Sequence, residues 1–217
     1  MFTLVIGGSA SGKSDYAERH VLSLGGDGPR IYIATMEPFG EEAQARIARH
    51  HAMRRGRGFE TIECYRNAGA VRLPENSNVL LEDLGNLAAN ELFGAELPQA
   101  DNGAELPQKQ GSTEPPQAEK QDGTEAQDGT EQHTDDISAA LSERIAAEID
   151  SFRSQCSHLT IVTNEVFSGG KEYEGETLTY LRLLAMLNRK LAAGADLVVE
   201  VVCGLPDILK GAQTQQN

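Results

Sequence analysis

The stretch that decides the fold is FTLVIGGSASGKSDYAERHVLSL, residues 2–24. It begins with a short apolar run at residues 2–6, which predicts a buried strand. Residues 14–24 then show the spacing of a helix, which is expected to end before Gly25-Gly26. Between the strand and the helix, the pattern G-x-x-x-x-G-K-[ST] is complete. Its members are Gly7, Gly8, Ser9, Ala10, Ser11, Gly12, Lys13 and Ser14.

This loop predicts a binding site for the phosphates of a nucleotide. Its glycines let the backbone turn tightly and aim N–H groups at phosphate oxygens, and the helix N-terminus adds partial positive charge. We expect Lys13 to contact the β- and γ-phosphates and the Ser14 hydroxyl to bind Mg²⁺. An accidental match in a Gly/Ser-rich turn is the alternative, and the flanking strand and helix disfavour it.

A second metal ligand is expected at the end of a neighbouring strand. Glu82 and Asp83 follow the apolar run at residues 79–81 and are both candidates. Glu82 is favoured because it follows the run directly. Asp83 would also suit the N-cap of the next helix.

Strand and helix patterns alternate along the chain. Near-continuous apolar strands of this kind predict an α/β fold, with a mostly parallel sheet that carries helices on both faces. Ligands then bind at the carboxyl ends of the strands. The expected strands are residues 2–6, 30–35, 79–82, 158–163 and 196–202, the last of them being the final strand, and the expected helices are residues 14–24, 41–55, 84–93, 137–152 and 177–193.

The charge of the chain is concentrated in one segment. The whole sequence has 19 Lys+Arg and 33 Asp+Glu, a formal net charge of −14, and residues 95–136 contain 11 of the acids and only two of the bases. In this segment AELPQ and QDGTE each occur twice, and there is no aromatic residue. It is too polar to bury a core, so we expect a disordered acidic low-complexity insertion, with an acidic partner-binding segment as the alternative. Residues 1–94 and 137–217 are expected to form a single domain.

Composition excludes several classes of protein. An acidic chain repels the phosphates of nucleic acids and of anionic membranes. No apolar run is long enough to span a bilayer, and the N-terminus does not resemble a signal peptide. The three cysteines are widely spaced and form no CxxC pair. We therefore expect a soluble protein of the reducing cytoplasm, without a disulfide framework.

Two adjacent histidines lie among four arginines at residues 46–55. Arg46, His50 and Arg54 are spaced four apart and would share one helical face, whereas His51 would point about 100° away. One interpretation is a solvated charged helix. The other is a phosphate-rich site in which a neutral imidazole acts as acid, base or nucleophile.

Several motifs occur in an order that resembles a known family. They are GG-S-x-SGKS, the Arg46–His50 segment, a strand ending in an acid, VTNEV at 162–166, N-x-x-LA-x-x-AD at 188–196 and GLP…K at 204–210. This order resembles the bifunctional adenosylcobinamide kinase/adenosylcobinamide-phosphate guanylyltransferase family over nearly the whole chain, except residues 95–136. The resemblance implies a RecA-like P-loop domain, commonly assembled as a homotrimer, with Mg²⁺ as its cofactor.

The resemblance also implies two reactions. Adenosylcobinamide is phosphorylated on its aminopropanol hydroxyl with ATP or GTP. GMP is then transferred from GTP to the new phosphate through a GMP-histidine adduct. His50 matches the adduct-forming histidine when it is counted from Arg46, and His51 matches when it is counted back from the stretch Phe59–Glu63. His50 is preferred, with a one-residue insertion in the Gly56–Gly58 loop.

Other residues take their expected roles from the same resemblance. Glu82 matches the strand-end acid that binds nucleotide and metal, and Glu63 matches a nucleotide-binding position. The motif at 164–166 is expected to contact ligand or metal. Asn90 and Asn188 fall on family positions, with ordinary helix residues as the alternative.

The chain also departs from the family pattern. Ala10 stands where the family has Arg, Gly85 where it has Thr and Phe59 where it has Trp, and the sequence differs at Tyr180, Leu181, Arg182 and Arg189. The departures in the latter half of the chain bear on cobinamide recognition and trimer contacts, whereas the phosphate-binding pattern is intact. Two other functions therefore remain open: a P-loop small-molecule kinase without nucleotidyl transfer, and a nucleotide-binding regulatory protein.

Overall fold

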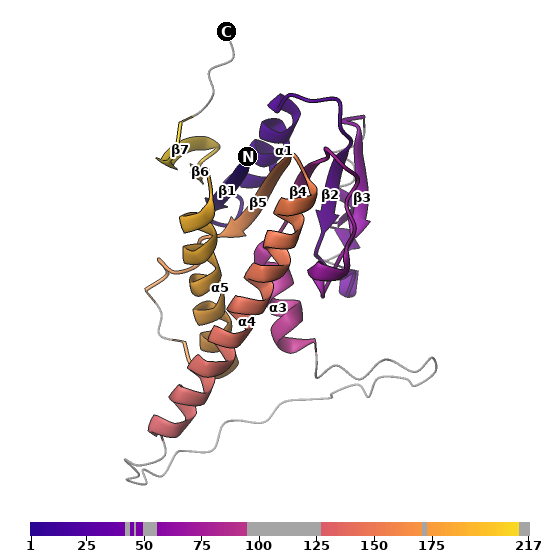
Figure 1. The fold of residues 1–217 in the computed structure, drawn as a ribbon. Helices are drawn as coiled ribbons and strands as arrows, with labels where there is room; N and C mark the ends of the chain where they lie inside the picture. The colour runs from indigo at the N-terminus through magenta and orange to yellow at the C-terminus, as the bar shows by residue number, and fades with distance from the viewer. Residues whose placement is uncertain (42–43, 46, 50–55, 95–126, 171–172, 213–217) are drawn as a thin grey trace.

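The fold is a seven-stranded sheet with helices on both faces (Figure 1). The computed structural model describes residues 1–41, 44–45, 47–49, 56–94, 127–170 and 173–212. The strands are β1 (Phe2–Gly7), β2 (Arg30–Ala34), β3 (Phe59–Glu63), β4 (Asn78–Glu82), β5 (His158–Asn164), β6 (Leu197–Val202) and β7 (Leu205–Lys210). The helices are α1 (Lys13–Ser23), α3 (Leu84–Phe93), α4 (Gln127–Gln155) and α5 (Gly175–Gly194), with a short 3₁₀ turn, η1, at Ala68–Ala70.

The strand order is β3-β2-β4-β5-β1-β6-β7. All neighbouring pairs are parallel except β6 and β7, which are antiparallel. Successive side chains of a strand point to opposite faces of the sheet, so the side chains of the apolar strands pack into two separate cores, one on each face. Leu4 packs into the core beneath α3, α4 and α5, and its neighbour Val5 packs into the core beneath α1. The predicted α/β fold is thus confirmed.

Two strands were not predicted. β3 reads FETIE, and its residues are partly or fully exposed, so it lacks the apolar run by which the other parallel strands are recognised. β7 reads LPDILK, is exposed along its whole length and contains a proline, as an edge strand tolerates. The sequence pattern predicted residues 196–202 as the final strand, and this prediction is wrong, because β7 follows β6 (Leu197–Val202).

The start of α4 also corrects the prediction. The helix was expected from Ile137, but it begins at Gln127, so residues 127–136 are helical and not disordered. These residues have no apolar stripe that could reveal a helix in the sequence, but they continue directly into a well-packed helical segment, and one of them, Asp135, pairs with Arg182 at 2.7 Å. Residues 95–126 lie outside the described residues, so the disorder of that part remains a prediction. Within the described parts of the chain, no helix is both long enough and apolar enough to cross a membrane.

Candidate nucleotide site

A cavity of about 650 Å³ lies at the carboxyl ends of the central strands. Its lining includes the phosphate loop after β1, the ends of β2, β3, β4 and β5, and a wall formed by Met36, Pro38 and Ile47. The cavity thus lies where a parallel sheet is expected to bind its ligand. Most of the predicted site residues that the structure describes line it, namely Ser9, Ala10, Ser11, Gly12, Lys13, Ser14, Glu63, Glu82, Asn164 and Val166.

The phosphate loop has the backbone shape that its sequence predicts. Gly12 is the N-cap of α1 and has φ 90°, a left-handed conformation that favours glycine. Gly7 packs so closely that an added Cβ would lie 2.8 Å from the carbonyl oxygen of Val201. The Lys13 ammonium donates to the carbonyl oxygen of Gly8 at 3.1 Å, so the lysine folds back over the loop. The loop therefore presents a helix N-terminus and a cation to the cavity, which suits phosphate.

Glu82 and Ser14 are joined across the loop. The Ser14 hydroxyl donates to the Glu82 carboxylate. The second oxygen of that carboxylate, Oε2, is buried and has no hydrogen-bond partner within the described residues. Burial raises the pKa of Glu82 to about 7; the negative charge of Asp83 also raises it, against the lowering effect of the Ser14 hydrogen bond.

These two side chains fit a magnesium ion. A buried carboxylate oxygen without a partner is stabilised by a cation, and Mg²⁺ prefers oxygen ligands. The described residues contain no cluster of three or more His, Cys, Asp or Glu that could hold a metal by itself. Such a pair suits an ion that takes its remaining ligands from nucleotide phosphates and water.

Asp83 has a different role from Glu82. Its carboxylate accepts from the backbone N–H of Asn86 at 2.6 Å and caps α3, and it also accepts from the Asn164 amide at 3.0 Å. Of the two metal candidates, only Glu82 is bonded to Ser14. The N-cap interpretation of Asp83 is confirmed.

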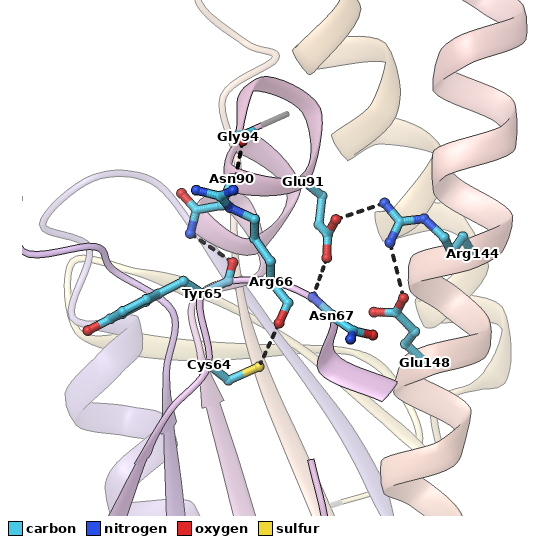
Figure 2. A network of polar contacts seen from close by, with 9 residues as sticks. All are labelled: Cys64, Tyr65, Arg66, Asn67, Asn90, Glu91, Gly94, Arg144 and Glu148. Carbon is cyan, nitrogen blue, oxygen red and sulfur yellow. Dashed lines mark hydrogen bonds and ion pairs between the residues drawn. The ribbon is translucent and has the colours of Figure 1, made fainter. Parts of the chain in front are cut away.

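Two asparagines hold the strand ends that border the cavity. The Asn90 amide donates to the carbonyl oxygens of Thr35 at 2.8 Å and Tyr65 at 3.0 Å, and Figure 2 shows it beside Tyr65. Asn188 accepts from the Thr163 hydroxyl at 2.7 Å. Neither asparagine lines the cavity. Both therefore act as internal braces, the more ordinary of the two interpretations.

The far wall of the cavity, at the end of β3, includes Tyr65, which the sequence did not single out, and Arg66 follows it outside the lining. The Tyr65 hydroxyl donates to the Glu63 carboxylate at 2.8 Å, and burial together with this carboxylate raises the pKa of Tyr65 to about 12. The Arg66 guanidinium donates to the carbonyl oxygen of Gly94 at 2.7 Å and pairs with Glu37 at 2.9 Å. Figure 2 shows Arg66 reaching the end of α3 at Gly94. Of these residues, only Glu63 was predicted from the sequence to be a site residue. The roles of Tyr65 and Arg66 depend on contacts with residues that lie elsewhere in the fold.

A second set of contacts in Figure 2 fastens the loop after β3 to two helices. The Glu91 carboxylate of α3 accepts from the backbone N–H of Asn67 at 2.5 Å and pairs with Arg144 of α4 at 2.8 Å. Arg144 also pairs with Glu148 at 3.2 Å. The far wall of the cavity is therefore braced by α3 and α4.

The predicted guanylyl carrier cannot be placed. His50 and its rival His51 lie outside the described residues, as do Arg46 and Arg54. Arg49, which directly precedes His50 in the chain, lines the cavity.

Two departures from the family pattern explain each other. An added Cβ at Gly85 would lie 2.8 Å from the Asn164 amide nitrogen and 2.9 Å from the Tyr180 hydroxyl. A threonine side chain would clash there, because the tyrosine hydroxyl and the asparagine fill its space. The tyrosine at position 180 therefore requires a residue without a side chain at position 85. Arg189 is exposed, and nothing in the structure explains that departure.

Comparison with known proteins identifies the family of this chain. The family described as "Cobinamide kinase / cobinamide phosphate guanyltransferase" matches residues 3–209. The chain belongs to this family. Within it, the bifunctional adenosylcobalamin biosynthesis protein CobU of Salmonella typhimurium is 30% identical over 214 residues, which cover 94% of this chain and 97% of that relative. The protein of the same name from Escherichia coli is 29% identical over the same shares of both chains.

Family membership confirms the resemblance found in the sequence and, with it, an enzyme class. Among solved structures, the ATPase domain of G40P aligns with a TM-score of 0.40 at 9% identity, covering 92% of this chain and 68% of that chain.

Proposed function

We propose that this protein phosphorylates adenosylcobinamide with ATP or GTP and then transfers GMP from GTP to the phosphate it has made. The observation that carries the proposal is a single cavity lined by the phosphate loop, the acid Glu82 and Arg49, the neighbour of His50. Both reactions break phosphoanhydride bonds of a nucleotide. One polyphosphate site can therefore serve them, with attack at different phosphorus atoms.

The kinase step depends on the phosphate loop. The substrate hydroxyl oxygen bonds to the γ-phosphorus and gives up its proton to solvent, and the bond from that phosphorus to the β,γ-bridging oxygen breaks, which releases a nucleoside diphosphate. Lys13 and the loop N–H groups neutralise charge that builds up between the β- and γ-phosphates. Ser14 and Glu82 would hold Mg²⁺, which supplies further neutralisation at the same oxygens.

The guanylyl step uses His50 as nucleophile. A ring nitrogen bonds to the α-phosphorus of GTP, the bond to the α,β-bridging oxygen breaks, and pyrophosphate leaves. A phosphate oxygen of adenosylcobinamide phosphate then attacks the same phosphorus and releases the imidazole. A neutral imidazole suits this step because it is nucleophilic near pH 7.

Glu63 is proposed as the contact to the nucleotide base. Its carboxylate lines the cavity on β3, and β1 and β3 are separated by three strands of the sheet. At roughly 4.8 Å between neighbouring strands, this separation leaves room for a nucleotide to extend from the phosphate loop. The Tyr65 hydroxyl holds one oxygen of this carboxylate, and the other oxygen remains able to accept from a base.

We also propose that the protein is a cytoplasmic homotrimer. Exposed aliphatic side chains gather on its last two strands, at Val202, Leu205, Ile208 and Leu209. Surfaces of this kind mark protein interfaces. The three cysteines are unpaired, which suits a reducing compartment. Light scattering tests the assembly against the 23.4 kDa mass of one chain, and a monomer mass would contradict it.

Incubation with GTP that carries a radioactive α-phosphate tests the function. The wild-type protein should acquire an acid-labile label and should phosphorylate adenosylcobinamide. His50→Ala should lose the label and keep measurable kinase activity, whereas the matched control His51→Ala should keep both. Loss of the label only in the control would move the carrier to His51. A wild-type protein that phosphorylates adenosylcobinamide but never acquires label would be a kinase without nucleotidyl transfer.

A further inference from the structure

The turn between β6 and β7 lies directly against the phosphate loop. The backbone N–H of Gly204 donates to the carbonyl oxygen of Ser11 at 2.7 Å. The approach is close, since a Cβ added to Gly12 would lie 3.1 Å from the Cα of Gly204. The loop at the start of the chain and a hairpin near its end are therefore in backbone contact.

The turn has a well-defined shape. Val202 pairs with Leu205, so Cys203 and Gly204 form a two-residue hairpin loop. Both have positive φ, 52° and 80°, as a type I′ turn requires. Glycine suits this geometry, whereas Cys203 occupies it at a cost of order 1 kcal/mol.

The far end of the hairpin is also held. The Lys210 ammonium donates to the carbonyl oxygens of Ala192 at 3.1 Å and Ala193 at 2.8 Å, at the end of α5. Figure 1 shows β7 beside β6 at the edge of the sheet, above the end of α5. Because β7 is exposed along its length, these polar contacts and its ladder with β6 hold it in place.

The contact acts on the part of the loop that must be preorganised. Both backbone polar groups of Ser11 are hydrogen-bonded. Its N–H donates to the carbonyl oxygen of Gly8 at 3.3 Å, and its carbonyl oxygen accepts from the N–H of Gly204. The preceding residue, Ala10, has φ 57°, which is unfavourable for alanine. A strained loop keeps its shape only when neighbouring structure supports it.

We propose that the Cys203–Gly204 turn is a positioning element for the phosphate loop, which it holds in the phosphate-binding shape before nucleotide arrives. The proposal rests on the nucleotide site proposed above. The turn does not line the cavity, so it acts through Ser11 and Gly12. Its effect should therefore be on nucleotide affinity, in both half-reactions alike.

The test compares two glycine variants. Gly204→Ala places a methyl group in open space at φ 80°, which strains the turn and shifts the donor. Gly26→Ala is the matched control, because it also has positive φ, 113°, and open space, but lies in the loop between α1 and β2, at the opposite ends of the strands. Both variants should lose similar stability in thermal unfolding.

Only Gly204→Ala should weaken the binding of Mg·ATP and Mg·GTP. Loss of one such hydrogen bond predicts a rise in Kd of about fivefold to tenfold. KM for nucleotide should rise in both reactions, with kcat at saturation unchanged. Wild-type affinity in Gly204→Ala would overturn the inference and leave the proposed function intact. A wild-type protein that binds no nucleotide would overturn both.

Hydrogen exchange of the wild-type chain provides a second measurement that needs no variant. Coupling between two sites is reciprocal, so saturating nucleotide should slow exchange in the peptide that covers residues 201–205. An exchange rate at Gly204 that is the same with and without bound nucleotide would overturn the inference, even if Gly204→Ala fails to fold.

Discussion

Arg57 should contribute more to the free energy of unfolding of this protein than an arginine on the surface does. It lies between Gly56 and Gly58 in the turn before β3, and its guanidinium donates to the Glu18 carboxylate of α1 at 2.6 Å. The Glu18 side chain is fully buried, with 0% exposure, and that of Arg57 is 31% exposed. A second carboxylate, Asp15, lies 3.8 Å from the same guanidinium.

The magnitude follows from this burial. Removing one partner of a fully buried ion pair costs about 3–5 kcal/mol, because a buried charge loses its compensation. Arg57 is partly solvated, so screening reduces the loss, and we expect Arg57→Ala to lower the free energy of unfolding by about 2 kcal/mol. An exposed pair such as Lys190–Glu143, with side chains 37% and 73% exposed, should contribute less than about 0.5 kcal/mol.

Urea unfolding followed by circular dichroism measures both quantities. Glu18→Gln and the double variant complete a mutant cycle that isolates the pair, and Lys190→Ala is the surface control. A loss below about 0.5 kcal/mol in Arg57→Ala, or a coupling energy near zero in the cycle, would refute the reasoning from burial.

Further predictions concern the site. The pKa of Glu82 is raised from 4.5 to about 7, so in the metal-free protein its burial costs nothing below pH 4.5, costs progressively more stability as the pH rises from 4.5 to about 7, and costs a constant amount above that. Glu82→Gln should therefore stabilise that protein by about 3 kcal/mol at pH 8 and by almost nothing at pH 4, in unfolding measured at each pH, and an equal effect at both would contradict the burial argument. Lys13→Ala should slow phosphorylation of adenosylcobinamide by a factor of about 10² or more, and a near-normal rate would remove the loop from the mechanism. Gly85→Thr should cost about 1–3 kcal/mol through its clash with the Tyr180 hydroxyl, and Tyr180→Phe in the same chain should restore part of the loss in urea unfolding. No restoration by the second change would show that the clash lies elsewhere.

The phosphate loop and the central strands were determined by the sequence alone. A G-x-x-x-x-G-K-S pattern specifies its own backbone shape, because its glycines permit left-handed angles and the helix begins at the next residue. The central strands are buried on both faces and so appear as apolar runs. Both signals are local, and both predictions agreed with the structure to within one residue.

Other features were decided only by the tertiary structure. β3 and β7 are edge strands with exposed residues, so no apolar run announces them. The sequence left Glu82 and Asp83 as rivals, and the bonds to Ser14 and Asn86 separated a candidate metal ligand from a helix cap. The contact of Gly204 with Ser11 joins residues almost two hundred positions apart. Local propensity carries no information on such pairs, because they exist only once the sheet brings the two ends of the chain together.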